Sequence, residues 1–304
     1  MQTKSEIKSL LEIAGLSPRK SLGQNFLTDK NLITKLIDAS GVGPGDLVVE
    51  VGPGTGTLTE ALLERGCQVI ACELDRGLAE LNRQRIPTLP LDGPNPGEYA
   101  RRFTLIEGDC LGPKRSINAD LAAAIGQRPF ALVANLPYAA ATPLMISLLI
   151  DYPMLACHTM AVTIQREVAE RLIAPPGSEA YGALGIVAQA MAETKIIAKL
   201  PPECFWPAPD VTSAMVLLRR RAEPATADGR GLMLLCQRLF AARRKQLGAI
   251  LGRATPLPPG IDPMARPEQL TIEQIVELQR TLTPHTTPPT PSPPPATGSD
   301  DSLP

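Results

Sequence analysis

The tetrapeptide Asn135-Leu136-Pro137-Tyr138 contains residue types suited to chemistry on an aromatic amine. The exocyclic amine of adenine is a poor nucleophile, because its lone pair is delocalised into the ring. The Asn135 side-chain carbonyl and the Leu136 main-chain carbonyl could each accept one amino hydrogen and turn the lone pair toward an electrophile. Pro137 would fix the backbone, and Tyr138 would offer a flat face on which a base can stack. The alternative is an ordinary proline turn after a strand.

Polar residues stand at the ends of three consecutive predicted strands. The apolar run 130–134 precedes Asn135, the run 67–72 precedes Glu73, and the run 103–106 comes shortly before Asp109. In a parallel sheet whose strands alternate with helices, ligands bind at the carboxyl ends of the strands. We therefore expect Glu73 to accept hydrogen bonds from ribose hydroxyls and Asp109 to accept one from the amino group of a cofactor adenine. For Asp109, the alternative is a solvated loop carboxylate.

A glycine loop follows the β-branched run 47–51. Gly52, Gly54 and Gly56 form the pattern G-x-G-x-G, whereas dinucleotide enzymes usually show G-x-G-x-x-G, whose third glycine would fall at Thr57. An acidic residue, Glu50, precedes the first glycine by two positions. This arrangement favours a ligand without phosphates, S-adenosylmethionine, over a nicotinamide dinucleotide. A purely structural glycine turn is the alternative.

The order of the patterns along the chain predicts an α/β, doubly wound sheet followed by a small C-terminal helical domain. Further strands are expected at 47–51, 159–164, 195–200 and 214–218, the last two as a hairpin; helices at 4–15 and 29–39, the second capped by Thr28 or Asp29; and a loop at 23–27. From 229 to 282 the pattern is helical, with eight basic and four acidic residues. The proline-containing stretch 87–97 is expected to be a surface insertion. We predict domains at 1–222 and 223–282, and a disordered Pro-rich tail at 283–304.

Bulk composition limits the class of protein. The 304 residues are 44% hydrophobic, enough for a sizeable core, and the formal net charge is −1. Six scattered cysteines and two histidines make a metal site or a disulfide framework unexpected, so we predict no metal. No apolar run approaches the roughly 20 residues that span a bilayer, and the first residues lack the apolar segment of a secretory signal. A cytoplasmic protein without membrane contact is expected.

One stretch carries basic residues without any acid. Five cations and no carboxylate lie between positions 238 and 253, including Arg243, Arg244 and Lys245. A local basic face of this kind is what a nucleic-acid backbone requires. The alternative is the solvated face of a helix.

Six motifs in one order resemble those of the rRNA adenine N6-dimethyltransferases, most of all the small-subunit members linked to kasugamycin sensitivity. They are residues 23–27 (GQNFL), 49–54 (VEVGPG), 73–75 (ELD), 135–138 (NLPY), 165–169 (QREVA) and 205–214 (FWPAPDVTSA). The resemblance covers residues 17–282. It implies a class I methyltransferase, Rossmann-like domain with an N-terminal lid segment, and a monomer acting on the small ribosomal subunit.

The resemblance also implies roles for particular residues. Cofactor contacts would come from Asn25, Leu27, Gly52, Gly54, Glu73, Asp109 and Asn135, the catalytic set would be Asn135, Leu136, Pro137, Tyr138 and Phe205, and RNA contacts would come from Arg243, Arg244 and Lys245. Phe205 would close on the target base opposite Tyr138. The substrate would be two adjacent adenines near the 3′ end of 16S rRNA, each dimethylated at N6. Ala139-Ala140-Ala141 and Asp210 depart from the family pattern, which has polar residues and a lysine there.

Three other functions are consistent with parts of the sequence. A relative that methylates large-subunit rRNA and confers antibiotic resistance would share the same motifs. A ribosome-assembly factor that acts mainly by binding would share the basic face. A nicotinamide oxidoreductase is disfavoured by the spacing of the glycines.

Overall fold

A seven-stranded mixed sheet forms the centre of the computed structural model, which describes residues 1–90, 97–151 and 157–282. Its strands are β2 (Leu47–Val51), β3 (Gln68–Glu73), β4 (Phe103–Glu107), β5 (Phe130–Asn135), β6 (Cys157–Gln165), β7 (Ala192–Leu200) and β9 (Ser213–Arg220). The order is β4-β3-β2-β5-β6-β9-β7, with five parallel strands and the antiparallel pair β9 and β7 at one edge. The predicted strands and the hairpin are confirmed, with ends that differ from the predicted ones by at most three residues.

Alternation of side chains along the strands gives the sheet two apolar faces. Val48 and Ala131 belong to the cluster that contains the buried residues of α2 and α3. Their neighbours Val49 and Leu132 belong to the cluster on the opposite face. Successive side chains of a strand point to opposite faces, so a run of apolar residues buries both. Near-continuous apolar runs such as 130–134 are therefore the signature of these central strands.

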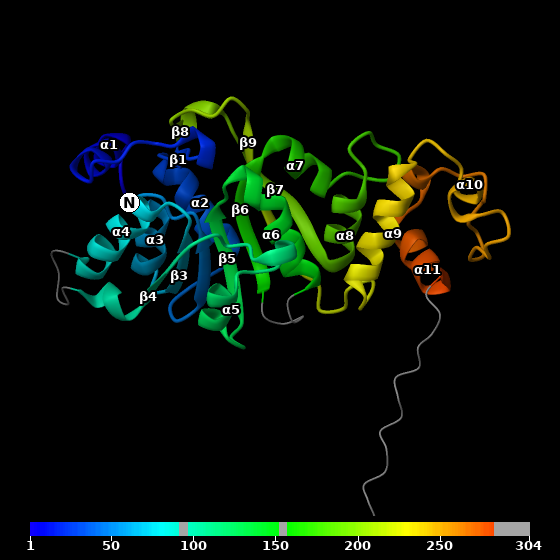
Figure 1. The fold of residues 1–304 in the computed structure, drawn as a ribbon, viewed down its shortest axis with the longest axis horizontal. Coiled ribbons are helices and arrows are strands. Elements are labelled where there is room, and N and C mark those ends of the chain that lie inside the picture. The colour runs from blue at the N-terminus through cyan, green and yellow to red at the C-terminus, as the bar shows by residue number, and fades with distance from the viewer. Residues whose placement is uncertain (91–96, 152–156, 283–304) are drawn as a thin grey trace, which may run out of the picture.

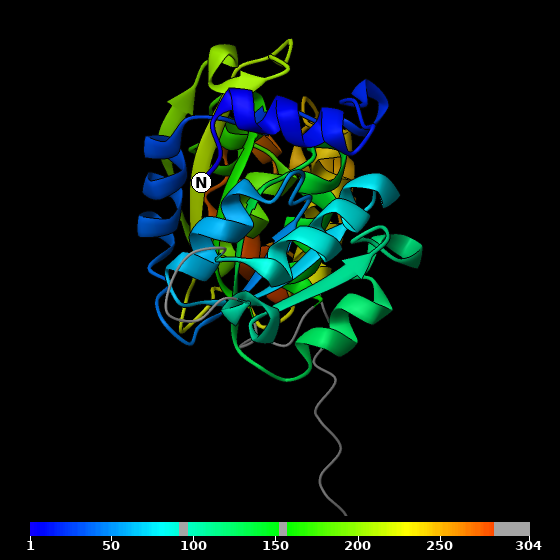
Figure 2. The same cartoon turned by 90° about the vertical axis from the view of Figure 1, so that its left-hand side faces the viewer.

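Helices cover both faces of the sheet. One face carries α2 (Lys30–Ser40), α3 (Thr57–Glu64) and α4 (Arg76–Arg85); the other carries α5 (Ala119–Ile125), α6 (Tyr138–Ile150), α7 (Arg166–Leu172) and α8 (Ala183–Met191). Asp29 caps α2 by accepting hydrogen bonds from the amides of Asn31 and Leu32, as its position in the sequence predicts. The helix α1 (Lys4–Ile13) packs on α4 through Ile7 and Leu11, and it lies across the top of the view in Figure 2.

Part of the segment 23–27 is a strand, which the sequence analysis did not predict. Phe26 and Leu27 form β1 (Phe26–Leu27), which pairs antiparallel with β8 (Phe205–Trp206). The Phe26 and Trp206 rings stack with centroids 6.2 Å apart. The partner strand lies far along the chain, and Figure 1 shows the two short strands side by side above the sheet. A pairing over such a sequence separation leaves no local pattern from which to predict it.

The C-terminal helices α9 (Gly229–Ala241), α10 (Leu247–Leu251) and α11 (Ile272–Leu282) stand at one end of the molecule, beside α8 (Figure 1). Leu232, Cys236 and Leu239 of α9 belong to the same apolar cluster as Leu184 and Met191 of α8. The predicted helical character of 229–282 is therefore confirmed, and its core is continuous with that of the sheet domain.

Some predictions concern residues outside the described ranges. Residues 91–96 of the proposed insertion 87–97 and the whole tail 283–304 lie there. Short 3-10 helices stand at the two ends of the insertion, Ile86–Thr88 and Glu98–Arg101. Within the described residues, no helix has the length and apolar character needed to cross a membrane.

Candidate active site

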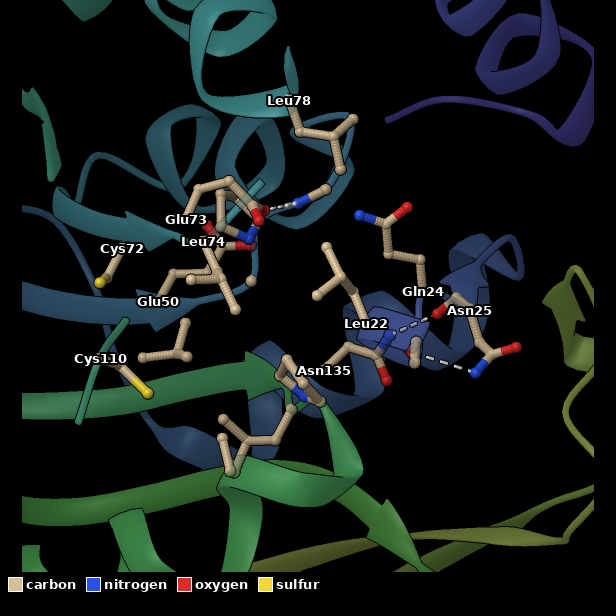
Figure 3. Close-up of a pocket in the computed structure, with 18 of the residues that line it drawn as sticks. Leu22, Gln24, Asn25, Glu50, Cys72, Glu73, Leu74, Leu78, Cys110 and Asn135 are labelled. Atoms are coloured by element: carbon tan, nitrogen blue, oxygen red, sulfur yellow. Dashed lines mark hydrogen bonds between the residues drawn. The ribbon is translucent and has the colours of Figure 1, made fainter. Parts of the chain in front are cut away.

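A cavity of about 490 Å³ opens at the carboxyl ends of β2, β3, β4 and β5 (Figure 3). It is lined by ten of the predicted site residues: Asn25, Leu27, Gly52, Gly54, Glu73, Asp109, Asn135, Leu136, Pro137 and Tyr138. Strands β2 and β5 pair in the centre of the sheet. From β2 the chain passes to β3 on one side, and from β5 it passes to β6 on the other side. This reversal of strand order is where open α/β sheets bind ligands.

The glycine loop forms one wall of the cavity. Gly52 and Gly54 have φ angles of +70° and +61°, which L side chains rarely adopt. A Cβ on Gly54 would lie 2.7 Å from Cε1 of Phe26, so the loop and the N-terminal segment are in close contact. Glycine at this position is required both by the backbone conformation and by the neighbouring ring.

Two buried carboxyl groups lie beneath this loop. Glu73 is 5% exposed and accepts hydrogen bonds from the amides of Gly54 (3.2 Å) and Asp75 (2.9 Å). Burial raises the pKa of Glu73 to about 7, although these hydrogen bonds oppose the shift. Glu50 is 1% exposed, accepts a hydrogen bond from the Thr59 hydroxyl at 2.6 Å, and has its pKa raised to about 8, mainly by burial. Both carboxyl groups therefore change charge near neutral pH.

The Asn135 carboxamide faces the N-terminal segment across the cavity. Its Nδ2 donates a hydrogen bond to the main-chain carbonyl oxygen of Asn25 at 2.8 Å (Figure 3). The Leu136 amide donates to the carbonyl oxygen of Thr163 in β6 at 3.1 Å, which ties the tetrapeptide to the sheet. Within the described ranges, neither Oδ1 of Asn135 nor the Leu136 carbonyl oxygen accepts a hydrogen bond. Two acceptors of the type predicted from the sequence thus stand at the cavity without internal partners.

Tyr138 and Phe205 do not both line the cavity, although the resemblance implies that they face each other across the target base. Tyr138 lines the cavity, and its hydroxyl shares a 2.7 Å hydrogen bond with the hydroxyl of Ser213. Burial raises the pKa of Tyr138, so the phenol stays neutral. Phe205 is 4% exposed in β8, packs in the core cluster of the α2 face, and does not line the cavity. The role of Phe205 opposite Tyr138 stays a prediction.

Asp109 follows β4 and lines the cavity beside Cys110. Its Oδ1 accepts a hydrogen bond from the amide of Leu111 at 2.9 Å. The six cysteines are free thiols, and Cys72 and Cys110 both reach the cavity wall. No group of three or more His, Cys, Asp or Glu side chains that could hold a metal occurs in the part of the chain that is described.

The predicted RNA-contacting residues have two different environments. Arg243 donates to Glu268 at 2.5 Å and to the carbonyl oxygens of Ser178 and Glu179. Arg244 and Lys245 are exposed and make no ion pair among the described residues. All three follow the end of α9, so they occupy a turn. Arg243 therefore holds this turn on the loop after α7.

Two residues of the site carry no predicted role although they belong to quoted motifs. Gln24 lines the cavity, and Asp75 is 3% exposed just behind it. In the sequence, only their places in the motifs 23–27 and 73–75 marked them, because their contact joins segments that lie far apart in the chain.

Comparison with known proteins places this arrangement in a family. The model of the family described as "Ribosomal RNA adenine dimethylase" matches residues 15–282. The chain is 40% identical to the ribosomal RNA small subunit methyltransferase A of Magnetococcus marinus, covering 93% of this chain and 98% of that protein. It is 38% identical to the protein of the same name from Streptomyces avermitilis, covering 90% and 91%.

Solved structures show the same fold. A dimethyladenosine transferase from Plasmodium falciparum matches with a TM-score of 0.66 at 22% identity, over 83% of this chain and 95% of that one. The 23S rRNA methyltransferase ErmE matches with a TM-score of 0.61 at 24% identity, over 85% and 99%. The prediction of a class I, α/β methyltransferase fold is confirmed, and so is the resemblance from which it came. The chain belongs to the ribosomal RNA adenine dimethylase family.

Proposed function

We propose that this enzyme transfers methyl groups from S-adenosylmethionine to N6 of two adjacent adenines near the 3′ end of 16S rRNA, giving dimethyladenosines. The observation that carries the proposal is the Asn135 carboxamide, which lies in one cavity with Glu73 and Asp109 and is held there by the Asn25 carbonyl. The names of the curated relatives support the small subunit as the substrate.

The residues of the cavity fit the proposed cofactor. Glu73 offers a buried carboxyl group for ribose hydroxyls, and Asp109 stands where an adenine amino group could donate to it. The buried hydroxyls of Thr55 and Thr57 line the same cavity and have no hydrogen-bond partner within the described chain. Buried polar atoms without partners are uncommon and are consistent with a polar ligand at this wall. The negative charge of the nearby Glu73 raises the pKa of Glu50 further.

The protein's part in the reaction is to hold and orient the amine. S-adenosylmethionine supplies a methyl group already activated by a sulfonium. The Asn135 Oδ1 and the Leu136 carbonyl oxygen would accept the two amino hydrogens of the target base, which favours a pyramidal nitrogen with its lone pair free. Fixed acceptors that need no reorganisation make this step mostly one of positioning.

The target adenine must leave its stack, at a cost of a few kcal/mol. Tyr138, hydrogen-bonded to Ser213, offers a ring for it, and stacking on one aromatic side chain stabilises a base by roughly 1–3 kcal/mol. The exposed cations Arg244 and Lys245 would meet the RNA backbone. With the ribosomal subunit as substrate, the site of action is the cytoplasm, and we propose that the enzyme works as a monomer.

The test is cofactor-dependent labelling of small subunits from cells that lack this activity. Radioactive S-adenosylmethionine should introduce label into 16S rRNA, and mass spectrometry should map it to two neighbouring adenines near the 3′ end. Label in large-subunit rRNA instead would identify the enzyme as a large-subunit rRNA methyltransferase and overturn the proposal.

A further inference from the structure

We propose that Asp75 and Gln24 are positioning residues: they fix the segment 19–27 so that the Asn25 carbonyl oxygen sets the orientation of the catalytic amide of Asn135. This inference deepens the proposed function and rests on it for its catalytic consequence. The contact between Gln24 and Asp75 can nevertheless be tested without any methyl transfer.

The Asp75 carboxylate divides its two oxygens between a helix and the N-terminal segment. Oδ1 caps α4 by accepting hydrogen bonds from the amides of Gly77 (2.9 Å) and Leu78 (3.2 Å). Oδ2 accepts a hydrogen bond from Nε2 of Gln24 at 3.1 Å and lies 3.3 Å from Nη1 of Arg19. Since Asp75 is 3% exposed, its contact with Gln24 is shielded from solvent and the charge needs these partners.

The Gln24 side chain makes two hydrogen bonds, one within the N-terminal segment and one to Asp75. Its Oε1 accepts a hydrogen bond from the Arg19 amide at 2.7 Å, while its Nε2 reaches Asp75. The turn between them is closed by the short 3-10 helix Lys20–Leu22. The Gln24 side chain therefore closes the turn between residues 19 and 24 and attaches this turn to the start of α4.

The other side of Asn25 is anchored as well. Phe26 pairs with Trp206 through β1 and β8, and its ring lies against Gly54. Asn25 thus stands between two anchored neighbours, and its carbonyl oxygen receives the Nδ2 hydrogen of Asn135 at 2.8 Å. Figure 3 shows this bond beside the Gln24 side chain.

The orientation of a carboxamide decides which atom it presents to a ligand. With Nδ2 bound to the Asn25 carbonyl, Oδ1 is the atom left for the amine of a base. If the segment were released, the Asn135 amide could rotate and present Nδ2 to the target amino group. In the reactive geometry that amino group cannot accept a hydrogen bond from Nδ2. Loss of the Asp75 contact should therefore lower the rate of transfer without removing any catalytic atom.

The experiment exchanges the donor and the acceptor. Gln24→Glu places a second carboxylate against Asp75. The double variant Gln24→Glu with Asp75→Asn restores one hydrogen bond in the opposite direction, while the substituted side chain still offers an oxygen that caps α4. Arg19→Ala is a milder variant, because Arg19 is 57% exposed. The matched control is Arg65→Ala, which breaks an ion pair with Asp38 away from the cavity.

We expect Gln24→Glu to lower kcat on undermethylated subunits about 10- to 100-fold, the range that misplacement of a reacting group produces. The double variant should regain most of this loss, and Arg65→Ala should match the unsubstituted enzyme. Hydrogen exchange at the amides of residues 22–28 should rise in Gln24→Glu and return in the double variant. Exchange in β2 and β3 should not change.

Two results would overturn the inference. Unchanged exchange at residues 22–28 in both Gln24→Glu and Arg19→Ala would show that Asp75 does not hold the segment. Raised exchange with an unchanged kcat in an active enzyme would show that the segment does not orient Asn135. If the unsubstituted enzyme labels no adenine, the proposed function fails, while the exchange data still decide whether the contact holds.

Discussion

At the scale of single residues, the site depends on which hydrogen-bonding groups are already satisfied. Asn135 donates to a main-chain oxygen and keeps its own oxygen free, and Leu136 donates to β6 and keeps its carbonyl free, as far as the described ranges show. The tetrapeptide predicts the two acceptors from residue type alone. What it does not predict is the donor contact that makes one amide orientation the stable one, because Asn25 is distant in sequence.

Asn135→Ala should lower the single-turnover rate of methyl transfer at least about 100-fold, since removal of one aligned polar group from a preorganised site costs that much in enzymes. RNA binding should change little, because the exposed cations are elsewhere. The measurement is quench-flow labelling of undermethylated small subunits together with a filter-binding assay. A rate equal to that of the unsubstituted enzyme would disprove the assigned role.

Glu50→Gln should stabilise the ligand-free protein at about pH 8.5 and leave its stability near pH 4.5 almost unchanged. Burial raises the pKa of Glu50 in the native state to about 8 from 4.5. Between these pH values the native state holds a proton that the unfolded state has released, so the free energy of unfolding falls as the pH rises. Thermal unfolding at both pH values measures the effect.

Glu12→Gln, at an exposed position of α1, is the control for that measurement. The Thr59 hydroxyl can still donate to the amide oxygen of a glutamine, so the Glu50 variant changes the charge and keeps the bond. An equal gain in stability at both pH values would mean that packing, and not ionisation, explains it.

At the scale of elements, parallel strands bring residues from positions 52, 73, 109 and 135 to one edge of the sheet. This much follows from the alternation of apolar runs with helical patterns, and it was predicted from the sequence. The pairing of β1 with β8 and the burial of Phe205 were not, because both depend on contacts between segments that lie far apart in the chain. Local patterns fix where a strand ends but not which short segments meet above it.

Gly54→Ala should weaken binding of S-adenosylhomocysteine at least about tenfold. The new Cβ would lie 2.7 Å from the Phe26 ring at a φ of +61°, so either the loop or the N-terminal segment must move. Titration calorimetry measures the affinity. Gly45→Ala provides the comparison, because it has a φ of +88° but open space around its Cβ; an equal loss of affinity there would contradict a local cause.

At the scale of the whole molecule, the C-terminal helices are packed against α8 and share its apolar cluster. The helical pattern of 229–282 was readable from the sequence, but this shared core was not, because helical periodicity does not say which surface a helix packs on. The domain boundary at 222 remains a prediction. The basic turn after α9 is held to the rest of the chain by Arg243, and Arg244 and Lys245 are exposed on it.

The double variant Arg244→Ala with Lys245→Ala should weaken binding to the small subunit and leave thermal stability unchanged. Each phosphate contact contributes about 0.7–0.9 to the slope of log affinity against log salt concentration, so the slope should fall by about 1.4–1.8. Arg243→Ala should instead lower the melting temperature, because it leaves Glu268 without its partner. Binding across a salt series and thermal unfolding separate these two effects, and an unchanged slope would exclude the turn from the RNA interface.

The catalytic amide takes its orientation from a peptide oxygen and not from a side chain. Every amino acid supplies that oxygen, so this contact depends on the strand register beside position 25 and not on the Asn25 side chain. Insertions or deletions between positions 24 and 26 would shift a different peptide opposite the amide. Among homologues, the number of residues between Gln24 and Phe26 should therefore stay invariant.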